Sequence, residues 1–328
     1  MPIIACHLLL LSLLLTALPS AGWGLEILYP PDKAVVTRSD YLIVRGGEQA
    51  LDGIVVEIKD YRSEMLEVGS DEYRKAFADF LIVAPVFDPG QNTIKVEGYA
   101  GGKVVATKTA DIYFEASPLD PAPSSYRKAL IHTPQQEAVC TPCHTMNPDA
   151  KALASESPKV NPCAACHLRM LDVPNVHGPA GVWQCTYCHQ ADSKPGRYQA
   201  RPGDAAVCNE CHEDKVQEFK GKKFVHGPIE AGMCLVCHDP HASNNPAQLV
   251  APVNELCLRC HEDISEKNHI VRGVGGKAHP LQGPENPAFP GKAFHCASCH
   301  DPHGGATEQY FQRDIENRMG LCQLCHKK

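Results

Sequence analysis

The chain has 328 residues, with 31 lysines and arginines against 38 aspartates and glutamates, so its formal net charge is −7. Because a nucleic-acid-binding protein needs a basic face, this balance argues against nucleic acid as a partner. The chain is also rich in cysteine and histidine, with 17 of each, and none of these lies between residues 25 and 116.

The first 22 residues are predicted to be a secretory signal peptide. Leu8 to Leu18 is an apolar stretch, and the small residues of Pro19-Ser20-Ala21-Gly22 follow it, as cleavage sites require. The segment before the stretch lacks the usual Lys or Arg. An uncleaved membrane anchor is the alternative, but the apolar run is short for a bilayer span, and no later segment is a candidate.

Residues 23–116 are predicted to form an immunoglobulin-like β-sandwich. Short alternating segments are separated by turn signals such as Asp88-Pro89-Gly90 and Gly101-Gly102. About seven short strands in this length are typical of such a sandwich. Either a spacer or folding cap, or a docking module, fits this region equally well. The expected strands are Leu25–Tyr29, Asp40–Arg45, Gly53–Asp60, Ala76–Val83, Thr93–Gly98 and Val104–Phe114.

A linker is expected over residues 117–129, because Ser117 to Ser125 contains three prolines. After it the composition changes sharply, with few apolar runs and little periodicity. The motif Cys-x-x-Cys-His occurs eight times in residues 130–328. The copies run from Cys140 to His144, Cys163 to His167, Cys185 to His189, Cys208 to His212, Cys234 to His238, Cys257 to His261, Cys296 to His300 and Cys322 to His326.

This motif is the signature of covalent c-type haem attachment. Two thiols three positions apart can reach the two vinyl groups along one edge of a porphyrin, and the adjoining His can then bind the iron. The alternatives are a zinc site, which needs a further Cys or His pair, and a redox dithiol, which usually occurs once and lacks the His. The sequence therefore predicts eight haem c groups. At about 24 residues per haem, the porphyrins would form the core, wrapped by loops and short helices.

The thioether cysteines are then the sixteen that remain after removal of the signal peptide, which leaves none for a disulfide. They are Cys140, Cys143, Cys163, Cys166, Cys185, Cys188, Cys208, Cys211, Cys234, Cys237, Cys257, Cys260, Cys296, Cys299, Cys322 and Cys325.

The eight motifs fall into four pairs. The first cysteines of the two motifs are 23 positions apart in the first three pairs and 26 apart in the fourth. A His lies eight positions before the first three pairs, at His132, His177 and His226, whereas the fourth pair has Ala288 there. Two motifs extend into Asp-Pro-His, ending at His241 and His303.

This arrangement resembles the doubled Cys-x-x-Cys-His family of multihaem cytochromes, and more widely the cytochrome c3-like group. The resemblance covers roughly residues 130–328 and is closest over residues 226–261. Such proteins are typical of anaerobic, metal- or sulfate-respiring bacteria. The first two pairs lack the Asp-Pro-His extension, which leaves their second iron ligands less well defined.

The motif histidines are the expected proximal ligands, and eight others match them in number. The proximal set is His144, His167, His189, His212, His238, His261, His300 and His326. The candidate distal set is His132, His177, His226, His241, His269, His279, His295 and His303. His295 adjoins its own motif and is the weakest candidate. If every iron has two histidines, some ligands must cross between pairs; Met146 or Met170 is the alternative at the N-terminal end.

Electron transfer is the expected function, because an iron with two histidine ligands is saturated and has no place for a substrate. No catalytic residue is expected, and the chain is predicted not to be an enzyme. A multihaem reductase of a small oxyanion is one alternative, although every motif keeps its His. A subunit of an extracellular cytochrome filament is the other.

The predicted location is the periplasm or the outer cell surface, because thioether attachment follows export. The expected partners are redox proteins, such as periplasmic or outer-membrane cytochromes and quinol-oxidising complexes. Residues 121–328 carry 21 basic and 21 acidic side chains, and the haem propionates would make the assembled region acidic. Such a surface suits docking to basic redox partners.

Overall fold

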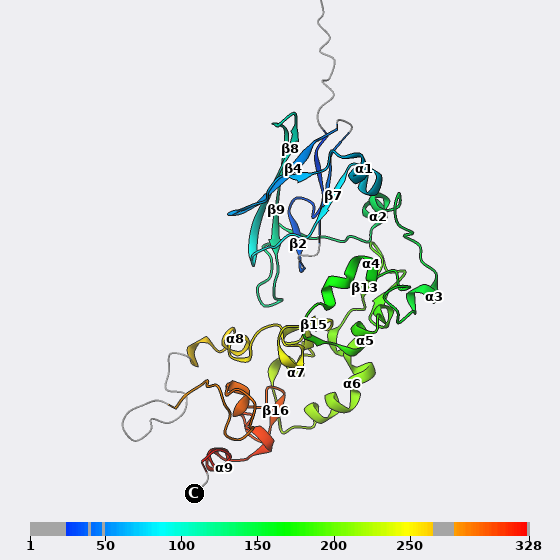
Figure 1. Ribbon diagram of the computed structural model, residues 1–328. Coiled ribbons are helices and arrows are strands. Elements are labelled where there is room, and N and C mark those ends of the chain that lie inside the picture. The colour runs from blue at the N-terminus through cyan, green and yellow to red at the C-terminus, as the bar shows by residue number, and fades with distance from the viewer. Residues whose placement is uncertain (1–23, 39–40, 48–49, 265–278, 327–328) are drawn as a thin grey trace, which may run out of the picture. The chain divides into compact units, whose positions relative to one another are not determined.

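A computed structural model describes residues 24–38, 41–47, 50–264 and 279–326. Strands dominate the N-terminal part, and loops with short helices make up the rest (Figure 1). The predicted signal peptide and His269 lie outside the described residues. Within the described ranges, no helix has the length and apolar character needed to cross a membrane.

The N-terminal strands form two sheets. The smaller sheet has the order β1-β3-β7 and is antiparallel. The larger has the order β10-β2-β9-β8-β4-β5, with β6 also pairing with β4, and its β2 runs parallel to both neighbours. The strands are β1 Glu26–Tyr29, β2 Ala34–Val36, β3 Leu42–Arg45, β4 Gly53–Ile58, β5 Tyr61–Arg62, β6 Leu66–Glu67, β7 Phe80–Val83, β8 Gly90–Ala100, β9 Lys103–Phe114 and β10 Arg127–Lys128.

The strand expected over Ala76–Val83 is wrong in its first half. Residues 71–77 form the helix α1 (Asp71–Phe77), and β7 begins only at Phe80. The Ser70 hydroxyl accepts a hydrogen bond from the Tyr73 amide at 3.1 Å, and Asp71 and Glu72 lie in the first turn. A capping serine followed by acidic residues favours a helix start, and this local signal outweighs the apolar pattern.

Alternation along the long strands builds a conventional apolar core in this region. In β8, Ile94 and Val96 are fully buried and Lys95 between them is not, whereas in β4 Ile54, Val55 and Val56 are all buried. Each such side chain stabilises the fold by about 1.5–3 kcal/mol. The buried Asn92 closes the preceding turn, because its amide donates hydrogen bonds to the Asp88 and Gly90 carbonyls at 2.8 and 3.0 Å.

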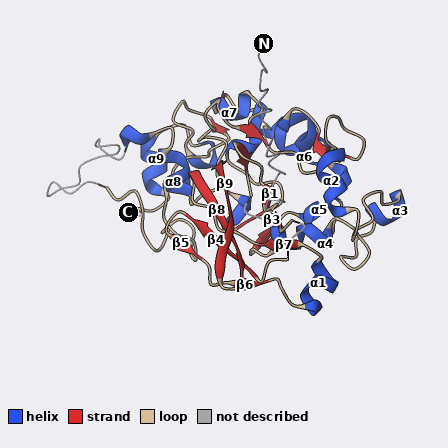
Figure 2. Ribbon diagram, turned by 90° about the horizontal axis from the view of Figure 1, so that it is seen from above, coloured by secondary structure: helices blue, strands red, loops and turns tan. Residues whose placement is uncertain are grey.

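The cysteine-rich part contains short elements (Figure 2). Its α-helices are α2 Pro134–Cys140, α3 Ala150–Leu153, α4 Ala164–His167, α5 Gly178–Gly181, α6 Asp204–Lys220, α7 Gly227–Glu230, α8 Val253–Leu258 and α9 Arg318–Gln323. Its ladders pair β11 Asn175–Val176 with β15 Ala242–Ser243, β12 His189–Gln190 with β13 Gln199–Ala200, and β14 Phe224–Val225 with β16 Gly304–Gly305. The 3₁₀ turns are η1 Leu168–Leu171, η2 Cys185–Tyr187, η3 Cys234–Val236, η4 Pro246–Gln248, η5 Glu262–Ile264, η6 Cys296–Ser298 and η7 Gln312–Asp314.

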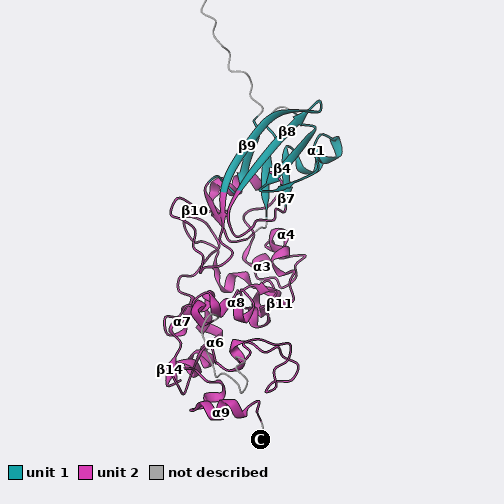
Figure 3. Ribbon diagram, turned by 90° about the vertical axis from the view of Figure 1, so that its left-hand side faces the viewer, with its two compact units in different colours: residues 1–32, 41–83, 93–111 teal, residues 33–40, 84–92, 112–328 magenta. Residues whose placement is uncertain are grey.

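The chain forms two compact units (Figure 3). One comprises residues 1–32, 41–83 and 93–111, and the other residues 33–40, 84–92 and 112–328. Two segments of the strand-rich region, including Arg38, therefore belong to the unit that carries the cysteines. The predicted domain limits at residues 116 and 130 stay a prediction.

Residues 113–328, which make up most of the second unit, bury few apolar side chains. Beyond Ile112, the described residues that are buried and apolar are Leu153, Ala164, Trp183, Ala242, Ala251, Phe294 and Phe311. A core this small cannot by itself offset the conformational entropy of ordering about 200 residues. The unit therefore needs apolar surface from another source, and covalently bound porphyrins would supply it.

Candidate functional site

Most of the Cys-x-x-Cys-His motifs lie on short helical turns, and the motif from Cys208 to His212 lies within the longer helix α6. In six of them the histidine amide donates a hydrogen bond to the carbonyl of the first cysteine, at 2.8 to 3.1 Å, as at His144 and Cys140 or His238 and Cys234. One helical turn places residues three apart on the same face. The two thiols therefore point to one side and the histidine follows directly, as attachment of one haem requires.

Six motif histidines lie opposite a histidine from outside the motifs, with ring centres 5.9 to 6.4 Å apart. These pairs are His167 with His132, His212 with His177, His189 with His241, His261 with His226, His238 with His303 and His326 with His279.

This separation fits two imidazoles on opposite sides of one metal. An imidazole nitrogen binds a metal at about 2.0–2.1 Å, and the ring centre lies roughly 1 Å further out, so two such ligands have centres about 6 Å apart. Rings in direct stacking contact come closer, as the 4.1 Å between Phe219 and His303 shows. The six histidine pairs therefore fit six haem irons.

The position of each candidate distal histidine in the sequence determines which motif histidine it faces. A histidine eight positions upstream of a pair, such as His177, lies opposite the second motif of its own pair. The histidine of an Asp-Pro-His segment lies instead opposite the first motif of the preceding pair, as His241 does with His189 and His303 with His238. Neighbouring pairs are thus interlocked.

Each Asp-Pro-His segment contacts both histidine pairs of the preceding repeat. Besides the ring of His241 opposite His189, the Pro240 carbonyl accepts a hydrogen bond from Nδ1 of His177 at 2.9 Å. The His177 amide also donates to the His241 carbonyl at 2.9 Å. This contact continues as the β11–β15 ladder, which fixes the spacing between the two repeats.

The next repeat shows the same arrangement. Nδ1 of His226 donates to the Pro302 carbonyl at 2.8 Å, and the His226 amide donates to the His303 carbonyl at 3.3 Å. Here the contact continues as the β14–β16 ladder. Each Asp-Pro-His segment therefore positions the candidate distal histidines of two neighbouring sites.

Three of the candidate distal histidines have a carboxylate beside Nδ1, and a cationic side chain lies close to each of these carboxylates. Glu137 lies 3.1 Å from His132 and 2.7 Å from Arg197. The other two are the Asp-Pro-His aspartates, Asp239 beside His241 with Arg38 and Asp301 beside His303 with Lys222; both imidazole-to-carboxylate distances are 3.2 Å.

The two aspartates are held ionised by these contacts. Burial would raise the pKa of Asp239, but hydrogen bonds from the side chain and amide of His241, together with the charge of Arg38, outweigh it and lower the pKa. The pKa of Asp301 is lowered in the same way by His303 and Lys222. At His303 the ionised carboxylate can accept a hydrogen bond from Nδ1, which would leave Nε2 of the imidazole for a metal. At His241 the Arg38 guanidinium also lies 3.0 Å from Nδ1, beside the Asp239 carboxylate at 3.2 Å.

Two motif histidines and two candidate distal histidines are outside these six pairs. His144 is solvent-exposed. Nδ1 of His300 lies 2.5 Å from the Gln309 carbonyl, and its ring is 6.0 Å from that of Phe311. His295 precedes η6, and its buried Nδ1 has no hydrogen-bond partner among the described residues. His269 cannot be placed.

Consecutive motifs lie side by side in chain order. At all seven steps a thiol of the next motif is close enough to raise the pKa of a cysteine in the motif before it. The cysteines whose pKa is raised, each with the neighbour that contributes, are Cys140 by Cys166, Cys163 by Cys185, Cys188 by Cys211, Cys208 by Cys234, Cys237 by Cys260, Cys257 by Cys296, and Cys299 by Cys325. The eight attachment positions therefore form an unbroken row.

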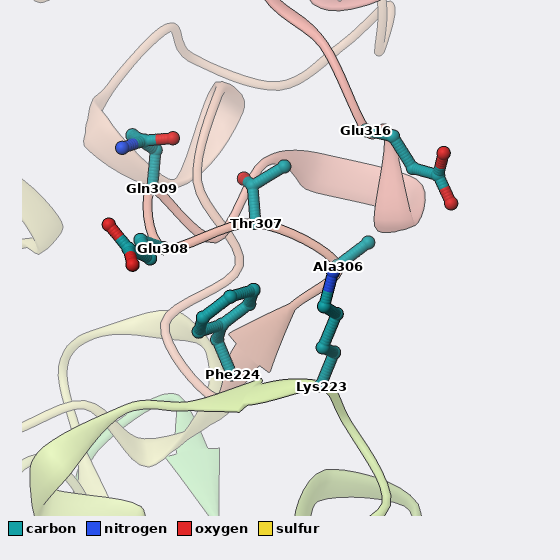
Figure 4. A pocket seen from close by; sticks show the side chains of 7 residues that line it. All are labelled: Lys223, Phe224, Ala306, Thr307, Glu308, Gln309 and Glu316. Carbon is teal, nitrogen blue, oxygen red and sulfur yellow. The ribbon is translucent and has the colours of Figure 1, made fainter.

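A surface pocket lies apart from this chemistry (Figure 4). Its lining includes Phe224, Glu308 and Glu316. None of its lining residues is a motif cysteine or a candidate iron ligand. In the described residues no group of three His, Cys, Asp or Glu side chains converges on a point where a bare metal ion could bind.

The sequence indicated the histidines but not the residues that orient them. The aspartates of the two Asp-Pro-His segments were visible as part of a recurring motif. Glu137, Arg197, Arg38 and Lys222 carried no comparable signal, because each reaches its partner through the tertiary fold. Arg197, for example, contacts a carboxylate 60 positions earlier in the chain.

A comparison with family models matches this part of the chain. The model for the doubled CXXCH motif matches residues 177–217, 226–266 and 288–328, which are the second, third and fourth pairs. Neither the curated proteins nor the solved structures gave a match. The C-terminal half of the chain carries doubled CXXCH repeats, which indicates that the protein is a multihaem c-type cytochrome.

Proposed function

We propose that this protein carries electrons along a row of eight haems, of which at least six have two histidine ligands. The observation that carries the proposal is the spatial order of the eight motifs, in which a thiol of each motif is close enough to a thiol of the next for their charges to interact. Haems attached at these positions would be close neighbours, so an electron could pass from each to the next without a mobile carrier.

The sixteen motif cysteines would hold the haems, and the motif histidines would bind the irons on one side. His132, His177, His226, His241, His279 and His303 would bind six of them on the other. The haem supplies one-electron chemistry between ferrous and ferric iron. Two imidazole ligands leave an iron no position for a substrate, which favours electron transfer over catalysis at these sites.

The protein's own groups would tune the row. Nδ1 of His132, His241 and His303 faces a carboxylate, whereas Nδ1 of His177, His226 and His279 faces a backbone carbonyl. A carboxylate acceptor gives the imidazole more anionic character, which stabilises ferric iron and lowers the potential. The row would therefore contain haems of differing potential.

We also propose that the strand-rich region is an immunoglobulin-like domain of an exported protein. Its two sheets with buried alternating faces support the first part, and haem attachment outside the cytoplasm supports the second. Redox proteins of the periplasm or outer surface are the proposed partners, and anaerobic or extracellular respiration is the proposed setting.

Protein-film voltammetry of the purified full-length protein tests the function. We expect reversible one-electron waves spread over a broad potential range, unchanged by nitrite, hydroxylamine or sulfite. A catalytic current with one of these compounds would contradict a pure carrier and favour the reductase. Monodisperse particles in negative-stain microscopy at high concentration would exclude the filament subunit.

A further inference from the structure

For two of the four first motifs, the histidine that faces the motif histidine comes from a fixed position in the next repeat. That position is the third residue after the next pair's first motif histidine: His241 follows His238, and His303 follows His300. These two side chains lie opposite His189 and His238, in the repeats before their own. The first pair, with His144, should by this rule receive its ligand from the third residue after His189.

That residue is Asp192, which is solvent-exposed. The loop that carries it closes as the other two do. Nδ1 of His189 faces the carbonyl of Tyr198, nine positions later, at 2.8 Å, just as His238 faces Ala247 and His300 faces Gln309. The loop around Asp192 thus keeps the backbone closure of its counterparts, but Gln190-Ala191-Asp192 stands where the others have Asp-Pro-His, so the imidazole is missing.

A second backbone hydrogen bond recurs at the same spacing in these three loops. The amide thirteen positions after the second cysteine of each motif donates to that cysteine's carbonyl, at 3.1 Å for Arg201 and Cys188, 3.0 Å for Val250 and Cys237, and 2.9 Å for Gln312 and Cys299. The correspondence of Asp192 with His241 and His303 therefore rests on backbone geometry as well as on sequence position.

His132 is the candidate distal histidine nearest to His144 in the sequence, but it already faces the motif histidine of another site. Its ring lies 6.2 Å from that of His167, and its Nδ1 is 3.1 Å from Glu137. The contact between the first two repeats also differs from the later ones, because the His132 carbonyl accepts its hydrogen bond from the Arg197 amide at 2.8 Å. Exposure alone does not distinguish His144, since His212, His261 and His326 are exposed too, but each of those faces a second imidazole.

We infer that the iron bound by His144 has no second histidine and binds a small neutral ligand of ferrous haem, such as carbon monoxide or nitric oxide. The inference rests on haem attachment at Cys140 and Cys143, which is part of the proposed function. It adds a ligand-binding site at the first haem of the row, while the other haems keep their role as carriers.

Titration of the dithionite-reduced full-length protein with carbon monoxide tests the inference. We expect carbon monoxide to bind at the His144 iron, with a shift in only a small part of the Soret absorption, and a high-spin ferric signal from that haem before reduction. Any carbon monoxide at the His300 iron would be counted in addition, so the total is at most about two molecules per chain. No binding and no high-spin signal would overturn it, because a ligand such as Met146 or His269 would then complete the site. A full complement of eight haems in the same sample would show that the proposed electron-transfer function survives that failure.

Substitution locates the site. Cys140→Ala with Cys143→Ala should remove one haem and one bound carbon monoxide per chain; an unchanged amount of bound carbon monoxide with seven haems would overturn the assignment to His144. If that variant does not mature, Asp192→His offers a second test, since restoring the imidazole should lower the bound carbon monoxide by about one per chain and weaken the high-spin signal, and unchanged binding would overturn the inference. The matched control is His241→Ala, which should open the His189 iron and raise the bound carbon monoxide by about one per chain.

Discussion

At the scale of single residues, the partner of each Nδ1 distinguishes the candidate haem sites. His241 and His303 face aspartates whose pKa is lowered, and each aspartate is also close to a cation, Arg38 or Lys222. His177 and His226 face proline carbonyls. Iron potentials respond to the basicity of the ligand, so these partners are the residues through which the chain would set the potential of each haem.

Replacing Asp239 with Asn tests this effect. The amide oxygen is a weaker acceptor than the carboxylate, and the difference is about 1 kcal/mol, or roughly 40 mV for a one-electron couple. We expect the potential of one haem to rise by about that amount in a spectropotentiometric titration.

Asp301→Asn is the matched control, because its carboxylate lies at the same 3.2 Å from His303. It should raise the potential of a different haem. Two variants with unchanged potentials would contradict a tuning role for these aspartates.

All candidate histidine ligands could be identified from the sequence, but the motif that each of them faces could not. Matched counts of motif and spare histidines suggested two imidazoles at every iron, and the need for ligands to cross between pairs followed from their uneven distribution. Which histidine faces which motif depends on the short ladders β11–β15 and β14–β16. Two-residue strands leave no periodic pattern in a sequence, so these pairings could not be predicted.

At the scale of elements, the short ladders are what align the repeats. Gly304 in β16 has a φ of +148°, and a Cβ there would lie 2.5 Å from the carbonyl oxygen of Phe224 in β14. A side chain at this position would force the two strands apart. Since these strands lead directly to His226 and His303, the strain would reach two candidate haem sites.

Gly304→Ala should therefore destabilise the third repeat by about 1–3 kcal/mol. We expect a lower temperature for the loss of the low-spin Soret spectrum, and additional carbon monoxide binding as His226 and His303 move away. Gly227→Ala is the control, because a Cβ at Gly227 meets nothing within 4 Å. Equal behaviour of the two variants would contradict the aligning role of the ladder.

In the sheet, Glu97 of β8 provides a test of acid stability. Hydrogen bonds from Lys95 and Arg62 lower its pKa from 4.5 to about 2. A carboxylate with a lowered pKa stabilises the folded state above its usual pKa, and this stabilisation disappears as the pH falls from about 4.5 toward 2.

In the Glu97→Gln variant, the stability of the folded state should depend less on pH between about 4.5 and 2. Exposed ion pairs contribute little, so we expect the substitution to lower the free energy of unfolding by at most about 1 kcal/mol at pH 6 and by less at pH 3. Hydrogen exchange of the β4 and β8 amides measures it without interference from haem absorption. Glu64→Gln, at an exposed carboxylate, is the control, and a loss that grows with falling pH would contradict the assignment.

Prediction of the elements succeeded where patterns were long and failed where they were short. Alternation predicted β9 to within one residue of its start but only the middle six of the eleven residues of β8. It missed β2, β5 and β6, which have two or three residues each. The helix α1 was missed because its apolar residues merged with those of β7, although Ser70 and the acids after it signal a helix start.

At the scale of the whole molecule, the two units differ in how they are stabilised. The first unit has an apolar core that includes the fully buried Leu42, Ile54 and Ile94. Residues 113–328 bury only seven apolar side chains in their described part. We therefore expect the first region to be ordered by its side chains and the second by its cofactors.

Expression without haem maturation tests this difference. In that apoprotein we expect slow amide exchange in β4 and β8 but rapid exchange throughout residues 130–328. Residues 33–38 come before residue 130 but belong to the second unit, and Arg38 lies within 3.3 Å of the Asp239 carboxylate. We therefore expect their amides to exchange rapidly in the apoprotein as well. Protection of residues 130–328 without haem would contradict a cofactor-dependent fold.

The central claim is that eight haems form one connected row that takes up and releases electrons. A reductive titration of the purified ferric protein, with added electrons counted against the growth of the ferrous α-band, tests it most directly. The account predicts that reduction is complete at about eight electrons per chain and is fully reversed by an oxidant. Completion at a smaller number, or a fraction of haem that stays ferric throughout, would contradict it.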